Sequence, residues 1–80
     1  MQLINIETFL CAARNQTLSD AAAALFVSQS TVSTRINQLE DELGVVLMRR
    51  GKGLRTVELT PQGTAFIPLA ERWLALHAET

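Results

Sequence analysis

Apolar residues recur at helical spacing near the start of the chain. The spacing i, i+3, i+4, i+7 is met by Ile6, Phe9, Leu10 and Ala13. An apolar stripe of this period predicts an amphipathic helix from Ile4 to about Arg14. The polar run at positions 15–17 interrupts the stripe and is expected to end the helix.

An alanine-rich segment follows this break. Positions 21–24 are four consecutive alanines, which combine high helix propensity with little bulk. Ser19 is expected to cap the segment, because its side chain can accept a bond from a free backbone N–H. Asp20 then falls in the first turn, where the helix dipole favours negative charge. The sequence therefore predicts a second helix from Asp20 to about Phe26.

The third helix has clear signals at both ends. Its apolar stripe, at spacing i, i+4, i+7, i+11, consists of Val32, Ile36, Leu39 and Leu43. Ser28 is a favourable N-cap, and Gly44 supplies the left-handed residue at which helices commonly end. We expect a helix from Gln29 to Leu43.

Beyond Gly44 the pattern changes to short apolar runs. The run 45–48 is suited to a strand, 51–53 (Gly-Lys-Gly) to a turn, and 56–59 alternates with period two. Together these segments predict a small β-hairpin, or wing. Thr60 and Pro61 then open a last helix, since proline at the first helical position sacrifices no hydrogen bond.

The last helix is apolar on two sides. One stripe consists of Phe66, Leu69, Ala70, Trp73 and Leu76, and the other of Ile67, Ala70, Leu74 and Ala78. A small domain can cover only one such stripe, so the other is expected to meet a partner, most simply a second copy of the chain. The alternative is one broad core-facing stripe with some exposed leucine.

The second and third helices have the features of a helix-turn-helix. Ala22 is small enough for the helices to cross closely, and Val27 can anchor the turn in the core. The start of the third helix carries short, mostly uncharged side chains, which can enter a DNA major groove about 12 Å wide. The candidate DNA-binding residues here are Ser28, Gln29, Ser30, Thr31, Ser33, Thr34, Arg35 and Asn37. The alternative, strongest for Ser28, is that these are ordinary polar residues of a helix start.

The charge distribution matters more than the total. A single domain of 80 residues with net charge −1 and a pI of about 5.7 argues on its face against nucleic acid. However, four of the seven basic residues fall at positions 49–55 with no acid among them. A wing beside the third helix is expected to lie along the phosphates or in the minor groove, with Arg50, Lys52 and Arg55 as contacts to the phosphate backbone. The acidic run 40–42 would repel phosphate, so the N-terminal half of the third helix is expected to enter the groove.

The chain as a whole resembles the N-terminal domain of the LysR-type transcriptional regulators. The resemblance is carried by Phe9, Ser19 to Ala22, Leu25, Val27 to Ser30, Val32, Ser33, Ile36, Leu39, Glu40, Glu42 to Gly44, Leu47, Arg50 and Leu59 to Gly63. Departures from the common pattern are Gln16 for a frequent glycine, Thr34 for a frequent basic residue and Met48 for a frequent phenylalanine.

This resemblance implies a mainly α fold with a small β-hairpin. Residues 1–60 are expected to form a winged helix-turn-helix and residues 61–80 a linker helix of the same structural unit. It implies sequence-specific binding of double-stranded DNA, as a homodimer on an interrupted inverted repeat. Intact family members are usually tetramers, and a co-inducer acts through a C-terminal domain that these 80 residues do not include. The expected dimer interface is Phe66, Ile67, Leu69, Ala70, Trp73, Leu74 and His77.

Other classes of function have little support in the sequence. Cys11 is the single cysteine and His77 the single histidine, so no disulfide or metal cluster is expected within the chain, and no cofactor. No carboxylate pair or phosphate-binding glycine loop indicates an enzyme. With neither a signal peptide nor a 20-residue apolar run, a cytoplasmic protein that does not enter membranes is expected. The remaining alternatives are the winged domain of molybdate-responsive regulators and a protein-interaction module.

Overall fold

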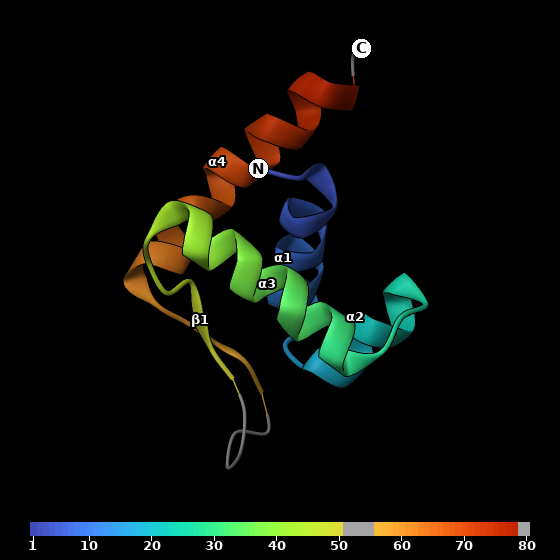
Figure 1. Ribbon diagram of the computed structural model, residues 1–80. Coiled ribbons are helices and arrows are strands. Elements are labelled where there is room, and N and C mark those ends of the chain that lie inside the picture. Colours follow the sequence, from blue (N-terminus) through green and yellow to red (C-terminus); the bar gives the residue numbers. More distant parts are fainter. Residues whose placement is uncertain (51–55, 79–80) are drawn as a thin grey trace.

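The chain forms a helical body with one short hairpin beside it (Figure 1). The computed structural model describes residues 1–50 and 56–78. Its elements in chain order are α1 (Leu3–Asn15), α2 (Leu18–Leu25), α3 (Gln29–Leu43), β1 (Met48–Arg49), β2 (Glu58–Leu59) and α4 (Pro61–Ala78). The predicted mainly α fold with a small hairpin is confirmed.

The junction between α1 and α2 is tighter than the sequence indicated. Gln16 adopts the left-handed conformation, with φ +67°, and its N–H donates to the Ala12 carbonyl at 3.0 Å. The next residue, Thr17, already caps α2, because its Oγ1 accepts from the Asp20 N–H at 3.0 Å. The prediction of Ser19 as the cap is therefore wrong: Ser19 lies inside the first turn.

The expected bounds of α3 are confirmed at both ends. Ser28 has an extended backbone, and its hydroxyl accepts from the Thr31 N–H at 3.1 Å. At the other end Gly44 has φ +72°, and its N–H donates to the Glu40 carbonyl at 2.8 Å. Glycine enters this left-handed region without the clash that a Cβ would bring.

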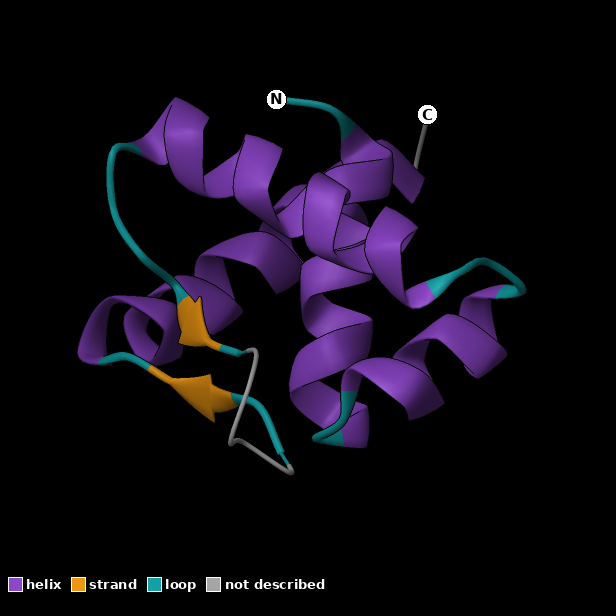
Figure 2. Cartoon of the chain, turned by 60° about the horizontal axis from the view of Figure 1, so that its bottom comes forward, coloured by secondary structure: helices purple, strands orange, loops and turns teal. Residues whose placement is uncertain are grey.

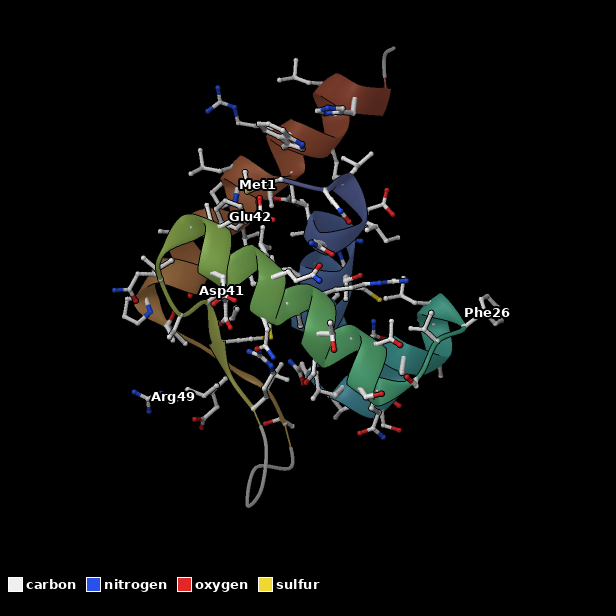
Figure 3. All side chains as sticks on the ribbon, in the orientation of Figure 1. Met1, Phe26, Asp41, Glu42 and Arg49 are labelled. Atoms are coloured by element: carbon white, nitrogen blue, oxygen red, sulfur yellow. The ribbon has the colours of Figure 1, made fainter. Side chains whose placement is uncertain are left out.

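The turn between α2 and α3 combines an anchored and an exposed apolar residue. Val27 is half-buried and packs against the core, as expected. Phe26 lies in the left-handed region, with φ +59°, and is 94% exposed. Its side chain points away from the body in Figure 3. Val27 is therefore the residue that ties the turn to the helices.

The core lies where α1 meets α3 and α4. Its largest fully buried side chains include Ile6, Phe9, Ile36 and Leu39. Each such side chain contributes about 1.5–3 kcal/mol through burial. The Phe9 ring also contacts the ring of Phe66 on α4, at a centroid distance of 5.7 Å and an angle of 56°. This packing fixes α3 on α1 and leaves the opposite side of α3 to solvent.

The hairpin is shorter than its apolar runs suggested. β1 and β2 are antiparallel and pair Met48 with Leu59 and Arg49 with Glu58 (Figure 2). Thr60 then joins the hairpin to α4: its N–H donates to the Leu47 carbonyl at 3.0 Å. The Thr60 hydroxyl accepts from the Gly63 N–H at 3.0 Å, which is the capping role predicted for it.

Candidate nucleic-acid interface

The polar face of α3 is turned to solvent along one line. A helix turns about 100° per residue, so spacing i, i+3, i+4, i+7 shares one side. On α3 that spacing is met by Ser30, Ser33, Thr34 and Asn37. Thr34 and Asn37 are exposed and Ser33 is half-buried, while Val32 and Ile36 face the core. The structure thus separates these four polar residues, the candidate reading face, from the packing face of α3.

The first turn of α3 contains a cluster of hydroxyl groups. The Ser28 Oγ lies 3.0 Å from the Ser30 Oγ and 2.9 Å from the Thr31 Oγ1. The Ser28 oxygen is also the helix cap. Ser28 and Thr31 therefore support the helix start, while Gln29 and Ser30 beside them are exposed.

Arg35 lies on a different flank from the other candidates. Its Nη1 donates to the Thr8 Oγ1 on α1 at 3.4 Å, and the side chain is half-buried there. Two residues after Ser33, it is turned by about 200° around the helix axis. The structure therefore does not bring Arg35 to the line that joins Ser33 and Asn37.

Arg50 is bound within the chain. It forms an ion pair with Glu40, with 3.1 Å between Nη2 and Oε1, and both side chains are only 12% exposed. Its Nη1 donates to the Met48 carbonyl at 3.1 Å and faces the Glu40 Oε2 at 3.4 Å. Nη2 also donates to the Asn37 Oδ1. All four terminal N–H groups thus have acceptors. A phosphate contact by Arg50, as predicted, would have to compete with these intramolecular hydrogen bonds.

Glu40 joins α3 to the start of the hairpin. Its Oε2 accepts from the backbone N–H groups of Leu47, at 2.7 Å, and Met48, at 3.3 Å. Burial raises the pKa of this carboxyl, but the hydrogen bond and charge of Arg50 and the two amide N–H groups outweigh it. The pKa consequently lies below the ordinary value of 4.5. The predicted repulsion between this carboxylate and phosphate is offset by Arg50.

Arg49 is the exposed basic residue of β1. In Figure 3 its side chain extends away from the body. Strand side chains alternate between two faces, so with Met48 buried, Arg49 points outward and Arg50 inward again. That period-two signal could have distinguished the two arginines in the sequence. Lys52 and Arg55 lie outside the described residues.

An open hollow lies between α3 and the hairpin. Its volume is about 450 Å³, and it is lined by Ser33, Asn37 and Glu40 of α3 together with Met48, Arg49 and Arg50. Leu18 and Val46 complete the lining. The structure thus brings together two groups that the sequence had marked separately, the polar face of α3 and the basic end of β1.

The two apolar stripes of α4 have different environments. Ile67 and Leu74 are half-buried and pack against the core, together with Phe66. Leu69 is 54% and Leu76 65% exposed, with Trp73 between them also exposed. The first predicted stripe is thus divided: Phe66 packs against the core, while Leu69, Trp73 and Leu76 form the open stripe. Leu76, which was not among the expected interface residues, is the most exposed member of the open stripe.

Ala70 and His77 complete the expected interface. Ala70 is 0% exposed, so its side chain has no surface to offer a second chain, and its assignment to the interface is corrected: it belongs to the core. His77 is exposed and stacks on Trp73 at a centroid distance of 5.1 Å. Its Nδ1 lies 2.9 Å from the Trp73 carbonyl oxygen.

A groove separates the open stripe of α4 from the start of α1. It has a volume of about 330 Å³ and is lined almost wholly by apolar atoms, from Met1, Ile6, Phe66, Leu69, Arg72, Trp73 and Leu76. In residues 1–50 and 56–78, no helix is long and apolar enough to cross a membrane. The same residues contain no cluster of metal-ligating side chains.

Comparison with known proteins assigns the chain to a family. The family model described as bacterial regulatory helix-turn-helix protein, lysR family, matches residues 3–64. The chain belongs to the LysR family. The HTH-type transcriptional regulator DsdC of Escherichia coli (strain K12) is 52% identical over 62 residues, covering 78% of this chain and 19% of DsdC. HdfR of Yersinia pestis (strain Pestoides F) is 41% identical over 69 residues, covering 86% of this chain and 23% of HdfR.

Solved structures of LysR-family proteins have the same fold. The CbnR DNA-binding domain, solved in complex with DNA, superposes with a TM-score of 0.91 at 35% identity, covering 99% of this chain and 88% of that one. The BenM DNA-binding domain with catB site 1 DNA gives 0.87 at 33% identity, covering 99% and 83%. This LysR-family chain spans about a fifth of the length of the curated relatives DsdC and HdfR. It corresponds in extent to the separate DNA-binding domains.

Proposed function

We propose that this chain is the sequence-specific DNA-binding domain of a transcription regulator. In this proposal α3 enters the major groove by its N-terminal half and the hairpin lies along the phosphates. The observation that carries it is that Ser33 and Asn37 of α3 and Arg49 of β1 all border one open hollow. The DNA complexes of CbnR and BenM, and the regulator names of DsdC and HdfR, support the same role.

The contacts divide into two kinds. Base edges are read from Gln29, Ser30, Ser33, Thr34 and Asn37, whose short polar groups fit hydrogen bonds in the groove. Ser28 and Thr31 are proposed to assist at the edge of this face, whereas Arg35 lies on a different flank of α3. Phosphates are met by Arg49, together with Lys52 and Arg55, which follow it in the sequence. Because such contacts act over a Debye length of about 8 Å, the net charge of −1 does not oppose them.

Substitutions should distinguish residues that recognise bases from residues that contact phosphates. Thr34→Ala is expected to reduce discrimination at one base pair about fivefold while leaving affinity for random duplex unchanged, because it removes one hydroxyl. Arg49→Ala should weaken binding to all sequences and lower the salt slope by about one, because one phosphate contact is lost. Band-shift titrations on selected and random duplexes at several salt concentrations measure both. Binding without salt dependence would indicate a protein-interaction module instead.

The second proposal is a homodimer through the open stripe of α4. Leu69, Trp73 and Leu76 present an apolar surface that the core does not cover, and the groove beside it continues onto α1. The copy in the dimer would cover this surface and place two reading helices on an inverted repeat. A tetramer and co-inducer control are proposed for the full-length regulator, acting in the cytoplasm.

A charge on the stripe should dissociate the dimer. Leu69→Asp is expected to weaken dimerisation at least thirtyfold, since burying an unpaired carboxylate costs about 2 kcal/mol or more. Ala75→Asp is the matched control, because this exposed residue lies off the stripe on the same helix. Sedimentation equilibrium gives the two association constants. Equal association of both variants with the parent chain would refute this interface.

A further inference from the structure

Asn37 has a side chain whose two ends are chemically distinct and differently placed. Its Oδ1 accepts a hydrogen bond from Arg50 Nη2. A guanidinium has only donors, so the amide cannot be reversed without setting its NH2 group against another donor. The oxygen therefore has to face Arg50, and the Nδ2 group has to point away from it. On an exposed side chain that borders the hollow, this leaves a donor directed outward.

Arg50 is itself fixed. Glu40 holds it through both carboxylate oxygens, at 3.1 and 3.4 Å, and the Met48 carbonyl accepts a further N–H at 3.1 Å. Because the terminal N–H groups are shared among these acceptors, the guanidinium cannot turn to release Asn37 without losing several bonds. Glu40 and Arg50 thus act as positioning residues for an amide that lies on the reading face.

The orientation of the amide restricts which bases it can recognise. An amide with both ends free pairs with adenine, donating to N7 and accepting from the N6 amino group. With its oxygen turned toward Arg50, Asn37 presents only its NH2 group to the groove, and it does so as a donor. Guanine offers two neighbouring acceptors in the major groove, O6 and N7, whereas cytosine presents a donor. A donor-only group therefore favours guanine, and disfavours cytosine most.

We propose that Asn37 determines specificity as a donor that reads guanine, with its orientation set by the Glu40–Arg50 pair. This inference rests on the proposed function, because it requires α3 to lie in the major groove. It assigns to Arg50 a role in base selection through Asn37, distinct from the phosphate contact expected of a basic wing residue. The base that the chain selects thus depends partly on Glu40 and Arg50, which contact no base themselves.

Selection from a random duplex pool tests this with the 80-residue chain and three variants. The parent chain should prefer guanine over adenine about fivefold at one base pair of each half-site, and Asn37→Ala should lose that preference. Asn37→Asp should move it to cytosine at the same base pair, because a carboxylate accepts from the N4 amino group. Arg50→Lys keeps the charge beside Glu40 but lacks the fork that holds the Asn37 oxygen, and should bring adenine up to at least the level of guanine.

Each contrary result has a distinct meaning. A parent chain that prefers adenine at the Asn37-dependent position would overturn the donor-only assignment. An unchanged guanine preference in Arg50→Lys, with unchanged urea unfolding, would overturn the positioning role. An Asn37→Ala variant with the parent's full base profile would remove Asn37 from the groove. Failure of the parent chain to select any sequence would instead refute the proposed function.

Discussion

Replacing Gly63 with alanine is expected to destabilise the domain by about 3 kcal/mol or more. A Cβ at this position would lie 1.8 Å from the Leu47 carbonyl oxygen and 2.8 Å from its carbon. Both are backbone atoms, so no side-chain rotation relieves the overlap. Alanine gains about 1 kcal/mol over glycine in helix propensity, but the overlap is the larger effect. Relief requires α4 to move from the hairpin and to strain the bonds between Thr60 and Leu47.

Gly44→Ala is the matched comparison for Gly63→Ala. A Cβ at Gly44 would meet nothing within 4 Å, but φ is +72°, so alanine should cost about 1 kcal/mol through backbone strain alone. Urea unfolding followed by circular dichroism measures both variants. Equal losses at the two glycines would mean that α4 does not need its close approach to Leu47.

Replacing Glu40 with alanine should have the second largest effect, a loss of about 2–3 kcal/mol. The carboxylate accepts from the Leu47 and Met48 N–H groups and pairs with Arg50, so its removal leaves several donors without their acceptor. Amide exchange at Leu47 and Met48 should accelerate together with the loss in urea stability. Asp41→Ala is the control, since this neighbouring carboxylate is exposed (Figure 3) and should matter by less than about 0.5 kcal/mol.

The same carboxylate predicts a dependence on acid. Its pKa in the folded chain lies below the ordinary value of 4.5, so protonation favours the unfolded state. The contribution is fully present above pH 4.5 and is lost as the pH falls through the lowered pKa. The difference in urea midpoint between the parent chain and Glu40→Ala should therefore shrink between pH 5 and pH 3. A constant difference across this range would contradict the role of the ionised group.

Local signals predicted the helices well where they were unambiguous. Ser28 and Gly44 fixed α3 because each lies directly beside an apolar stripe and suits only one position of a helix end. Thr17 and Ser19 could both cap α2, and the choice depended on Gln16, which ends α1 with a left-handed residue. Such a backbone choice in a residue with a side chain is not visible in sequence spacing.

The sequence indicated which residues lie at the candidate site better than it indicated the hydrogen bonds that they form there. The polar face of α3 follows from helical periodicity, which holds whatever surrounds the helix. The side-chain partners of Arg50 are 10 and 13 residues away, on another element, and no local pattern says which acceptor it meets. Likewise, the two stripes of α4 were visible in the sequence, but only packing against α1 showed that Ala70 is enclosed and Leu76 is not.

The hydrogen bond from the Val57 N–H to the Gln16 carbonyl, at 2.7 Å, completes a closed ring of contacts that joins the helices to the hairpin strands. From Gln16 the chain passes through α2 and α3 to Glu40, whose carboxylate bonds to the start of β1. β1 pairs with β2, and Val57 directly before β2 bonds back to Gln16. In such a ring, tilting the helix requires the strands to follow. Helix α3 and the two strands should therefore contact DNA as one rigid unit. We expect the duplex, and not the protein, to bend or to widen its groove.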